Sequence, residues 1–246
     1  MYAKREGEEM SPKLRIINKM LNDSAEIFPF YIKNMGLDTE DNKFGLGHER
    51  KIIKKRLEML LNIFGREKLI ELSLNELQNK NYEVRLGAIA LLDDIDAKDI
   101  TNRLINSLFD DFSTVSIIAA KIIGNYGDEK YTELLIKVID NFKYSSLPNV
   151  KEAIISLGKI GNYKAILKLY EIVSVDGDNV DNTLKVYIYE KCKTFAIESI
   201  KSITARDKKA LEIYSKLLNN NIDNEITNLK LKLKLREKYN LTFELK

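Results

Sequence analysis

The chain is poor in the residues from which catalytic and metal centres are commonly built. Its 246 residues include no tryptophan, one histidine and one cysteine. Multi-histidine metal sites and an internal disulfide are therefore excluded. We expect no catalytic residue, no metal and no cofactor, and we interpret Cys192 as a small buried hydrophobe within a helix.

His48 and the paired acids have simple structural interpretations. His48 follows "FGLG" at the expected start of a helix and is expected to face solvent. The pairs Asp93/Asp94 and Asp110/Asp111 lie at expected turns between helices, where carboxylates commonly cap helix ends. The sequence therefore predicts a protein that is not an enzyme.

Chain breakers and long apolar runs are also scarce. Three prolines and eleven glycines leave long uninterrupted segments, which favours an all-α fold. No apolar run approaches the length of a membrane span, and the first residues, "MYAKREGEEMSPK", have no signal-peptide core. We expect a soluble cytoplasmic protein with no membrane segment.

The clearest element of the sequence is a helix–turn–helix unit, "TVSIIAAKIIGNYGDEKYTELLIKVID". One apolar stripe at helical spacing marks the first helix, formed by Val115, Ile118, Ala119, Ile122, Ile123 and Tyr126. Gly127 suits the end of this helix, and Asp128 can cap the second, whose own stripe begins at Tyr131.

The unit recurs 34 residues later as "NVKEAIISLGKIGNYKAILKLYEIV". Gly158 and Gly161 take the places of Gly124 and Gly127, and Asn162 takes the capping position. We interpret these glycines as closing turns, and not as phosphate loops, because they follow helices.

Weaker copies flank these two. One is "EVRLGAIALLDDIDAKDITNRLINSL", in which Asp93 and Asp96 replace the glycines. Another has its first helix around Cys192 and "DKKALEIYSKLL" as its second. An upstream helix pair turns at Gly65. Paired helices repeated at this spacing are typical of an α-solenoid.

The repeats resemble the HEAT-like repeats first recognised in phycobilisome lyases. That pattern places Val-Arg, small residues, Leu-Gly and Gly-Asp before the second helix, and it is met by Val84, Arg85, Ala119, Gly124, Gly127, Asp128, Ala153, Leu157, Gly158, Gly161 and Asn162. The resemblance implies an α-α superhelix of the armadillo type, with about five helix pairs and helical caps at both ends.

Three parts of the chain are expected. Residues 1–48 would form a flexible N-terminus and a helical cap, residues 49–219 the HEAT-like array, and residues 220–246 a C-terminal helix and basic tail. Within the tail, "NLKLKLKLREKY" alternates like a strand, yet a lone hairpin is marginal in water. We favour a helix to about Tyr239 over the hairpin.

Charge is balanced over most of the chain and basic at its end. Residues 228–246 hold six Lys/Arg against two Asp/Glu, whereas the remaining residues hold 34 against 35. The lysines of the tail are most simply a solvated coat. Their alternative role is phosphate contact through Lys230, Lys232, Lys234 and Arg236.

The resemblance implies that the second helices line a concave surface. Arg103, Lys137, Lys164 and Lys168 come from three of these helices, and we predict that they form a protein-binding ridge on a non-enzymatic scaffold. Scattered surface charge is the simpler interpretation of the same residues.

Nucleic-acid binding is the alternative function, because a family of alkylpurine DNA glycosylases also consists of HEAT-like repeats. Those enzymes use tryptophans and a strongly basic concave surface, whereas this chain has no tryptophan and a balanced body. Binding through the basic tail is the form of this alternative that we retain. A chromophore-lyase role rests on fold analogy alone and ranks third.

Overall fold

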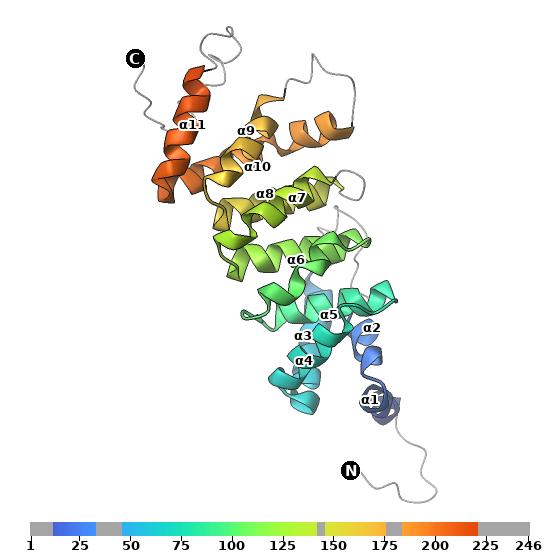
Figure 1. The fold of residues 1–246 in the computed structure, drawn as a ribbon. Coiled ribbons are helices and arrows are strands. Elements are labelled where there is room, and N and C mark those ends of the chain that lie inside the picture. The colour runs from blue at the N-terminus through green and yellow to red at the C-terminus, as the bar shows by residue number, and fades with distance from the viewer. Residues whose placement is uncertain (1–11, 33–45, 142–145, 176–183, 221–246) are drawn as a thin grey trace, which may run out of the picture. The chain divides into compact units, whose positions relative to one another are not determined.

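The computed structural model describes residues 12–32, 46–141, 146–175 and 184–220, and every regular element in these ranges is a helix (Figure 1). The predicted all-α class is confirmed for this part of the chain. None of the described helices has the length and apolar character needed to cross a bilayer. The chain divides into two compact units, Met1–Arg103 and Leu104–Lys246.

Unit 1 (Met1–Arg103) consists of short helices with well-defined ends. The elements are α1 (Pro12–Asn22), η1 (Ser24–Glu26), α2 (Ile27–Ile32), α3 (Leu46–Phe64), α4 (Arg66–Glu76), α5 (Tyr82–Asp94) and η2 (Thr101–Leu104), whose last residue belongs to unit 2. Gly65 separates α3 from α4 with a φ of 75°, a conformation that glycine adopts without strain. The predicted turn at Gly65 is confirmed.

The packing of α2 against α5 forms the core of unit 1. Ile27, Phe28 and Tyr31 of α2 are fully buried. A Cβ atom on Gly87 of α5 would lie 2.4 Å from the backbone oxygen of Phe28, so only glycine permits this approach. The Tyr31 hydroxyl donates a hydrogen bond to the Asp94 carboxylate. Asp94 thus joins two helices, whereas its sequence position had suggested a helix cap.

Unit 2 (Leu104–Lys246) contains three consecutive helix pairs. They follow η3 (Asn106–Phe109) and are α6 (Ser113–Tyr126) with η4 (Glu129–Tyr131) and α7 (Thr132–Asp140), α8 (Leu147–Ile160) with α9 (Lys164–Ser174), and α10 (Leu184–Arg206) with α11 (Lys208–Asn220). The first helices pack in the order α6, α8, α10, and the second helices in the order α7, α9, α11. The described residues therefore form an α-helical, repeat-like arrangement.

The stripe predicted for the first of these pairs lies in the core of unit 2. Val115, Ala119, Ile122 and Ile123 are fully buried, while Ile118 and Tyr126 are half-buried at its margin. Equivalent residues of the next pair, Ala153, Ile154 and Leu157, are also fully buried. Helical periodicity therefore located the buried face of these helices correctly.

The earlier copy differs from expectation in its second half. The segment "DAKDITNRLINSL" was expected to be an α-helix, but it forms the 3₁₀ helices η2 and η3. Thr101, Asn102, Asn106 and Ser107 all have side chains that compete for backbone hydrogen bonds and so weaken an α-helix. Asp96, at the place of Gly127, adopts a φ of 55°, which Asp tolerates better than most residues.

The glycines of unit 2 divide into two roles. Gly127 and Gly161 end α6 and α8, and a Cβ atom at either would lie 2.5 Å from the carbonyl oxygen four residues earlier. Gly124 and Gly158 instead lie inside their helices. A Cβ at Gly158 would lie 2.6 Å from Ser199 Oγ, so this glycine permits α8 and α10 to approach closely and does not close a turn. Our expectation that all four glycines close turns was wrong for Gly124 and Gly158.

Candidate functional site

Two of the four residues predicted to form a protein-binding ridge lie on α9. Lys164 Nζ is 2.5 Å from Glu133 Oε1 on α7. Lys168 Nζ is 2.7 Å from Asp140 Oδ1 on α7 and 2.5 Å from Glu171 Oε2 on α9 itself. Both lysines therefore tie α9 to α7 through ion pairs, and their charge is neutralised within the fold.

Lys168 is the most enclosed of these cations, with 16% of its side chain exposed. Burial opposes the charge on its ammonium group, but the hydrogen bonds to Asp140 and Glu171 outweigh burial and raise its pKa. Burial raises the pKa of the neighbouring Tyr189 hydroxyl to about 12. Lys168 is consequently protonated at neutral pH, which makes it unsuited to act as a nucleophile or general base.

Glu171 completes the network by accepting two lysines. Its Oε1 lies 2.6 Å from Lys185 Nζ on α10, while its Oε2 pairs with Lys168. Burial alone would raise the pKa of this carboxyl, but the hydrogen bonds from Lys168 and Lys185 prevail and lower it. The ion-pair network therefore connects α7, α9 and α10, the expected behaviour of charges that position helices.

The other predicted site residues are placed differently. Lys137 is exposed on α7. Arg103 is exposed in η2 and belongs to unit 1, so it is described apart from the three lysines of unit 2. The candidate phosphate contacts Lys230, Lys232, Lys234 and Arg236 lie outside the described residues. Their role, and the question of helix or hairpin, stay predictions.

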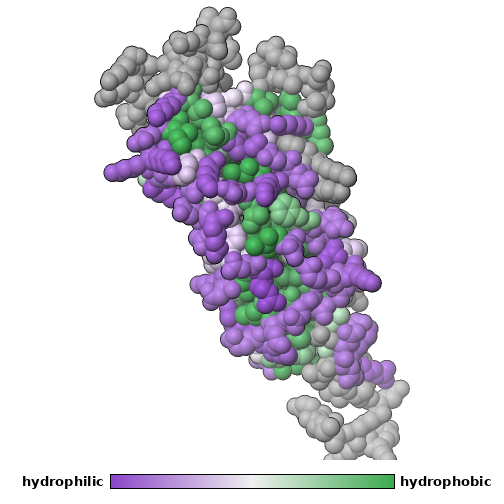
Figure 2. Space-filling view, in the orientation of Figure 1, coloured by the Kyte–Doolittle hydropathy of each residue, from purple (hydrophilic) through white to green (hydrophobic). Residues whose placement is uncertain are grey.

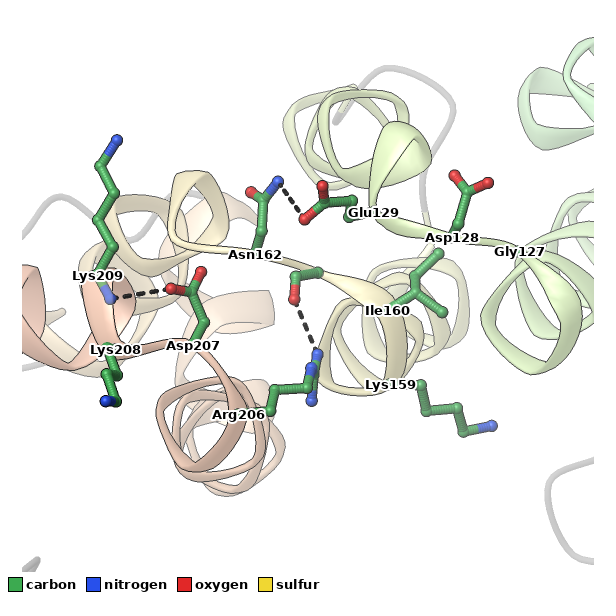
Figure 3. A pocket seen from close by; sticks show the side chains of 11 residues that line it. Gly127, Asp128, Glu129, Lys159, Ile160, Asn162, Arg206, Asp207, Lys208 and Lys209 are labelled. Carbon is green, nitrogen blue, oxygen red and sulfur yellow. Dashed lines mark hydrogen bonds between the residues drawn. The ribbon is translucent and has the colours of Figure 1, made fainter.

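A polar hollow of about 570 Å³ lies at the turns of unit 2 (Figure 3). We call it the turn hollow. Each of the three helix pairs contributes the turn between its two helices, and Lys159 near the end of α8 also contributes. The lining consists of Gly127, Asp128, Glu129, Lys159, Ile160, Gly161, Asn162, Arg206, Asp207, Lys208 and Lys209. Its volume falls within the range of about 300–1,000 Å³ that is usual for ligand pockets.

The three turns share one type of side-chain hydrogen bond. Asp128 Oδ1 accepts a hydrogen bond from Lys130 N at 3.0 Å, and Asn162 Oδ1 accepts one from Lys164 N at 3.0 Å. The predicted capping roles of Asp128 and Asn162 are confirmed. Asp207 repeats this geometry by accepting from the backbone N–H of Lys209 at 2.9 Å.

Asp207 also connects two neighbouring turns. Its Oδ2 accepts a hydrogen bond from the backbone N–H of Tyr163 at 2.9 Å, across the boundary between the second and third helix pairs. The Asp207 carboxylate is thus occupied by backbone donors on both oxygens. The recurring Asp or Asn before each second helix was the sequence signal for the hollow, but nothing in the sequence indicated that the turns lie side by side.

Arg206 is a lining residue of the turn hollow that connects α10 to α8. Its guanidinium donates to the carbonyl oxygens of Gly158 at 2.7 Å and Gly161 at 2.8 Å, so it caps the end of α8 from α10. Burial lowers the pKa of Arg206, although Asp207 nearby acts in the opposite direction. This role of Arg206 was not predicted from the sequence, because these two acceptors are main-chain groups 45 or more residues away.

The lysines of the hollow have neutral partners or none. Lys159 Nζ donates to Asn125 Oδ1 at 2.8 Å, and Lys209 Nζ lies 3.6 Å from the centre of the Tyr163 ring. Within the described ranges, neither these two lysines nor Lys208 forms an ion pair with a carboxylate. Figure 3 shows Lys159 on one side of Arg206 and the pair Lys208 and Lys209 on the other.

Exposed apolar side chains interrupt the polar surface. Hydrophilic residues cover much of the face seen in Figure 2, and apolar side chains show between them. On α9, Leu167 lies next to Lys168 and is 61% exposed. A leucine surrounded by charged residues is a common feature of protein contact surfaces, although single exposed leucines also occur elsewhere.

Cys192 is fully buried in α10, as predicted from its place in the helical pattern. Burial raises the pKa of its thiol to about 11, so the thiol is protonated at neutral pH and is a poor nucleophile. Over the described part of the chain, no group of three or more His, Cys, Asp and Glu side chains could hold a metal ion.

Comparison of the chain with protein-family models and with curated proteins found no match.

Proposed function

We propose that this chain is a HEAT-like α-solenoid that acts as a non-enzymatic scaffold for another protein. The observation that carries the proposal is the turn hollow, where three equivalent helix pairs present their turns side by side. Repetition of this kind builds one extended surface from short units, which is how solenoid proteins commonly bind partners.

The packing of the first helices supports the solenoid architecture. Equivalent glycines, Gly124 and Gly158, each meet a serine of the following first helix. Ser156 Oγ donates to the backbone oxygen of Ala120, and Ser199 Oγ donates to that of Ile154, both at 2.8 Å. The same contact therefore recurs at successive interfaces, as expected for stacked repeats.

The state of the ionisable groups supports a role without catalysis. Lys168 has a raised pKa, and the Cys192 thiol is buried and protonated. Lys164 is held by Glu133. None of these groups has the perturbation that would prepare a nucleophile or a general base for work at neutral pH.

The ion pairs on α9 change where the binding surface is best placed. Lys164 and Lys168 were predicted to contact a partner, but a partner would have to displace Glu133, Asp140 or Glu171 to reach them. The turn hollow has cations that need no such displacement. We therefore place the principal protein contact at the turn hollow, with Lys137 and Leu167 available on the helix face.

Affinity capture from a lysate of the source cells tests the scaffold. The full chain and a variant that ends at Asn228 are used as bait, each with and without nuclease. Discrete proteins retained by both baits after nuclease treatment are the expected result. Recovery of nucleic acid instead, lost on truncation or at high salt, would favour the nucleic-acid alternative through residues 229–246.

A further inference from the structure

Two groups of cations in unit 2 differ in their surroundings. On the helix face, Lys164, Lys168 and Lys185 each pair with a carboxylate at 2.7 Å or less. At the turn hollow, the positive groups are Lys159, Arg206, Lys208 and Lys209, and their described partners are amide or carbonyl oxygens or an aromatic ring. Among the described residues, ion pairs therefore compensate these three lysines on the helix face, but not the cations of the hollow.

The lining keeps a net positive charge, because its four cations outnumber its three carboxylates. Local groups already occupy much of the accepting capacity of these carboxylates. Asp207 accepts backbone N–H groups on both oxygens. Asp128 caps η4, and its Oδ2 lies 3.2 Å from Nζ of Lys130, a residue that does not line the hollow. Glu129 Oε2 accepts from the Asn162 side chain at 3.3 Å, which is a long hydrogen bond. Glu129 is therefore the carboxylate with the most remaining accepting capacity.

Three backbone N–H groups at the starts of α9 and α11 are likewise occupied. Asn162 accepts from Lys164 N, and Asp207 accepts from Lys209 N and Ala210 N. Side chains therefore supply most of the donors for a ligand. The available donors are the ammonium groups of Lys159, Lys208 and Lys209, which lie on opposite sides of Arg206 (Figure 3). This arrangement fits an extended ligand with separated negative charges better than a single compact anion.

We propose that the turn hollow of unit 2 binds an acidic segment of a partner protein. Carboxylates of the segment pair with Lys159 on one side and with Lys208 and Lys209 on the other, and a main-chain N–H of the segment donates to Glu129. This inference rests on the proposed scaffold function and names the chemistry of the partner.

The mixed lining favours a peptide over a nucleic acid. A peptide offers both carboxylates for the lysines and N–H donors for Glu129 and Asp128. A nucleic-acid backbone presents a continuous row of phosphates and no N–H donor, so some phosphates would lie against Asp128, Glu129 or Asp207, whereas a peptide can place its carboxylates at the lysines alone. Peptide chemistry therefore matches both signs of charge in the lining.

Fluorescence anisotropy with purified full-length chain tests the inference. The probe is a short fluorescein-labelled peptide of alternating glutamate and glycine, and the comparison ligand is single-stranded DNA of equal charge. The double variant Lys208→Glu/Lys209→Glu should bind the peptide about tenfold more weakly than the wild type, because two attractive contacts become repulsive. Lys159→Glu should weaken binding by a smaller factor.

A matched control is available in unit 1. Lys54 and Lys55 of α3 are adjacent and exposed like Lys208 and Lys209, so Lys54→Glu/Lys55→Glu changes the net charge by the same amount. The control should bind the peptide within about twofold of the wild type, and every variant should keep its helical circular dichroism and its melting temperature. Equal losses in the control and in the hollow variant would overturn the inference, because net charge alone would explain binding.

Three further outcomes would each reject either the inference or the scaffold function. Tighter binding of the DNA than of the peptide, lost in the hollow variant, would assign the hollow to nucleic acid and overturn the inference. Unchanged peptide binding by Lys208→Glu/Lys209→Glu, with discrete proteins still captured from lysate, would reject the hollow and leave the scaffold function standing. If the peptide binds and only the hollow variant weakens it, but no protein is captured from lysate, the scaffold function would be rejected and the acidic-ligand chemistry of the hollow would stand.

Discussion

Gly124 of α6 lies so close to Ser156 of α8 that a Cβ atom on the glycine would be 2.4 Å from Ser156 Oγ. The same relationship recurs between Gly158 and Ser199 at the next interface. In each case the serine donates to a carbonyl four residues before the glycine, at Ala120 or Ile154. Thus the glycine of one first helix leaves room for the serine of the next first helix. This pairing sets the register of the stacked helices.

Gly124→Ala should destabilise the protein although alanine is the better helix former. Alanine gains about 1 kcal/mol of helix propensity, but overpacking of a tight interface costs about 1–3 kcal/mol, and the Ser156 backbone cannot move aside easily. We expect a net loss of about 1 kcal/mol in the free energy of unfolding, measured by urea denaturation. Thr194→Ala, at an exposed position of α10, is the control and should change stability little. A stabilised Gly124→Ala variant would contradict the close contact.

Asp207→Ala should lower stability by about 1–2 kcal/mol, because it removes the acceptor for the first N–H groups of α11 and for Tyr163 N. Asp207→Asn keeps one side-chain oxygen and should lose less. Urea denaturation measures both variants. An alanine variant as stable as the wild type would show that the carboxyl oxygens are not needed as acceptors.

The ion-pair network of Glu171 should make stability depend on acid pH. Hydrogen bonds from Lys168 and Lys185 outweigh burial and hold the folded-state pKa of Glu171 below its ordinary value of 4.5. A carboxyl with a lowered folded pKa stabilises the fold above its unfolded pKa, and this contribution is lost as pH falls through the folded pKa. Unfolding free energies of the wild type should therefore decrease as pH falls below 4.5.

Lys168→Met tests this assignment. The methionine retains much of the apolar stem but cannot pair with Asp140 or Glu171, so the variant should lose about 1 kcal/mol at neutral pH and show a shallower acid dependence. Lys137→Met, on the exposed face of α7, is the matched control. If the free energies of unfolding of the wild type and Lys168→Met had the same pH dependence, the ion-pair network would not be its cause.

The Cys192 thiol should be unreactive in the folded protein. It is fully buried, and its pKa is raised to about 11, so both access and thiolate population are low at neutral pH. A disulfide reagent such as 5,5′-dithiobis(2-nitrobenzoic acid) should react at once with the chain unfolded in urea. It should react with the native chain only as fast as local unfolding exposes the thiol. Rapid reaction of the native protein would place the thiol at the surface.

The helices and turns of unit 2 were predictable because their signals are local. The stripe from Val115 to Tyr126 follows from helical periodicity, which requires only residues three and four positions apart. Capping by Asp128 and Asn162 involves backbone donors two residues away. The 3₁₀ helices η2 and η3 were missed because Thr, Asn and Ser weaken an α-helix gradually and leave the apolar pattern intact.

Tertiary structure alone decided which charges are neutralised and which are presented. Lys164 and Lys168 look like free cations along the chain, but packing of α9 against α7 brings Glu133 and Asp140 to them. Packing likewise places Asp207 beside Tyr163, 44 residues away, and so assembles the turn hollow. The sequence by itself determined the helical repeats, since periodicity and capping act over a few residues. Which carboxylate pairs with which lysine depends on the distances between helices that are far apart in the chain. Only the packing of these helices sets those distances.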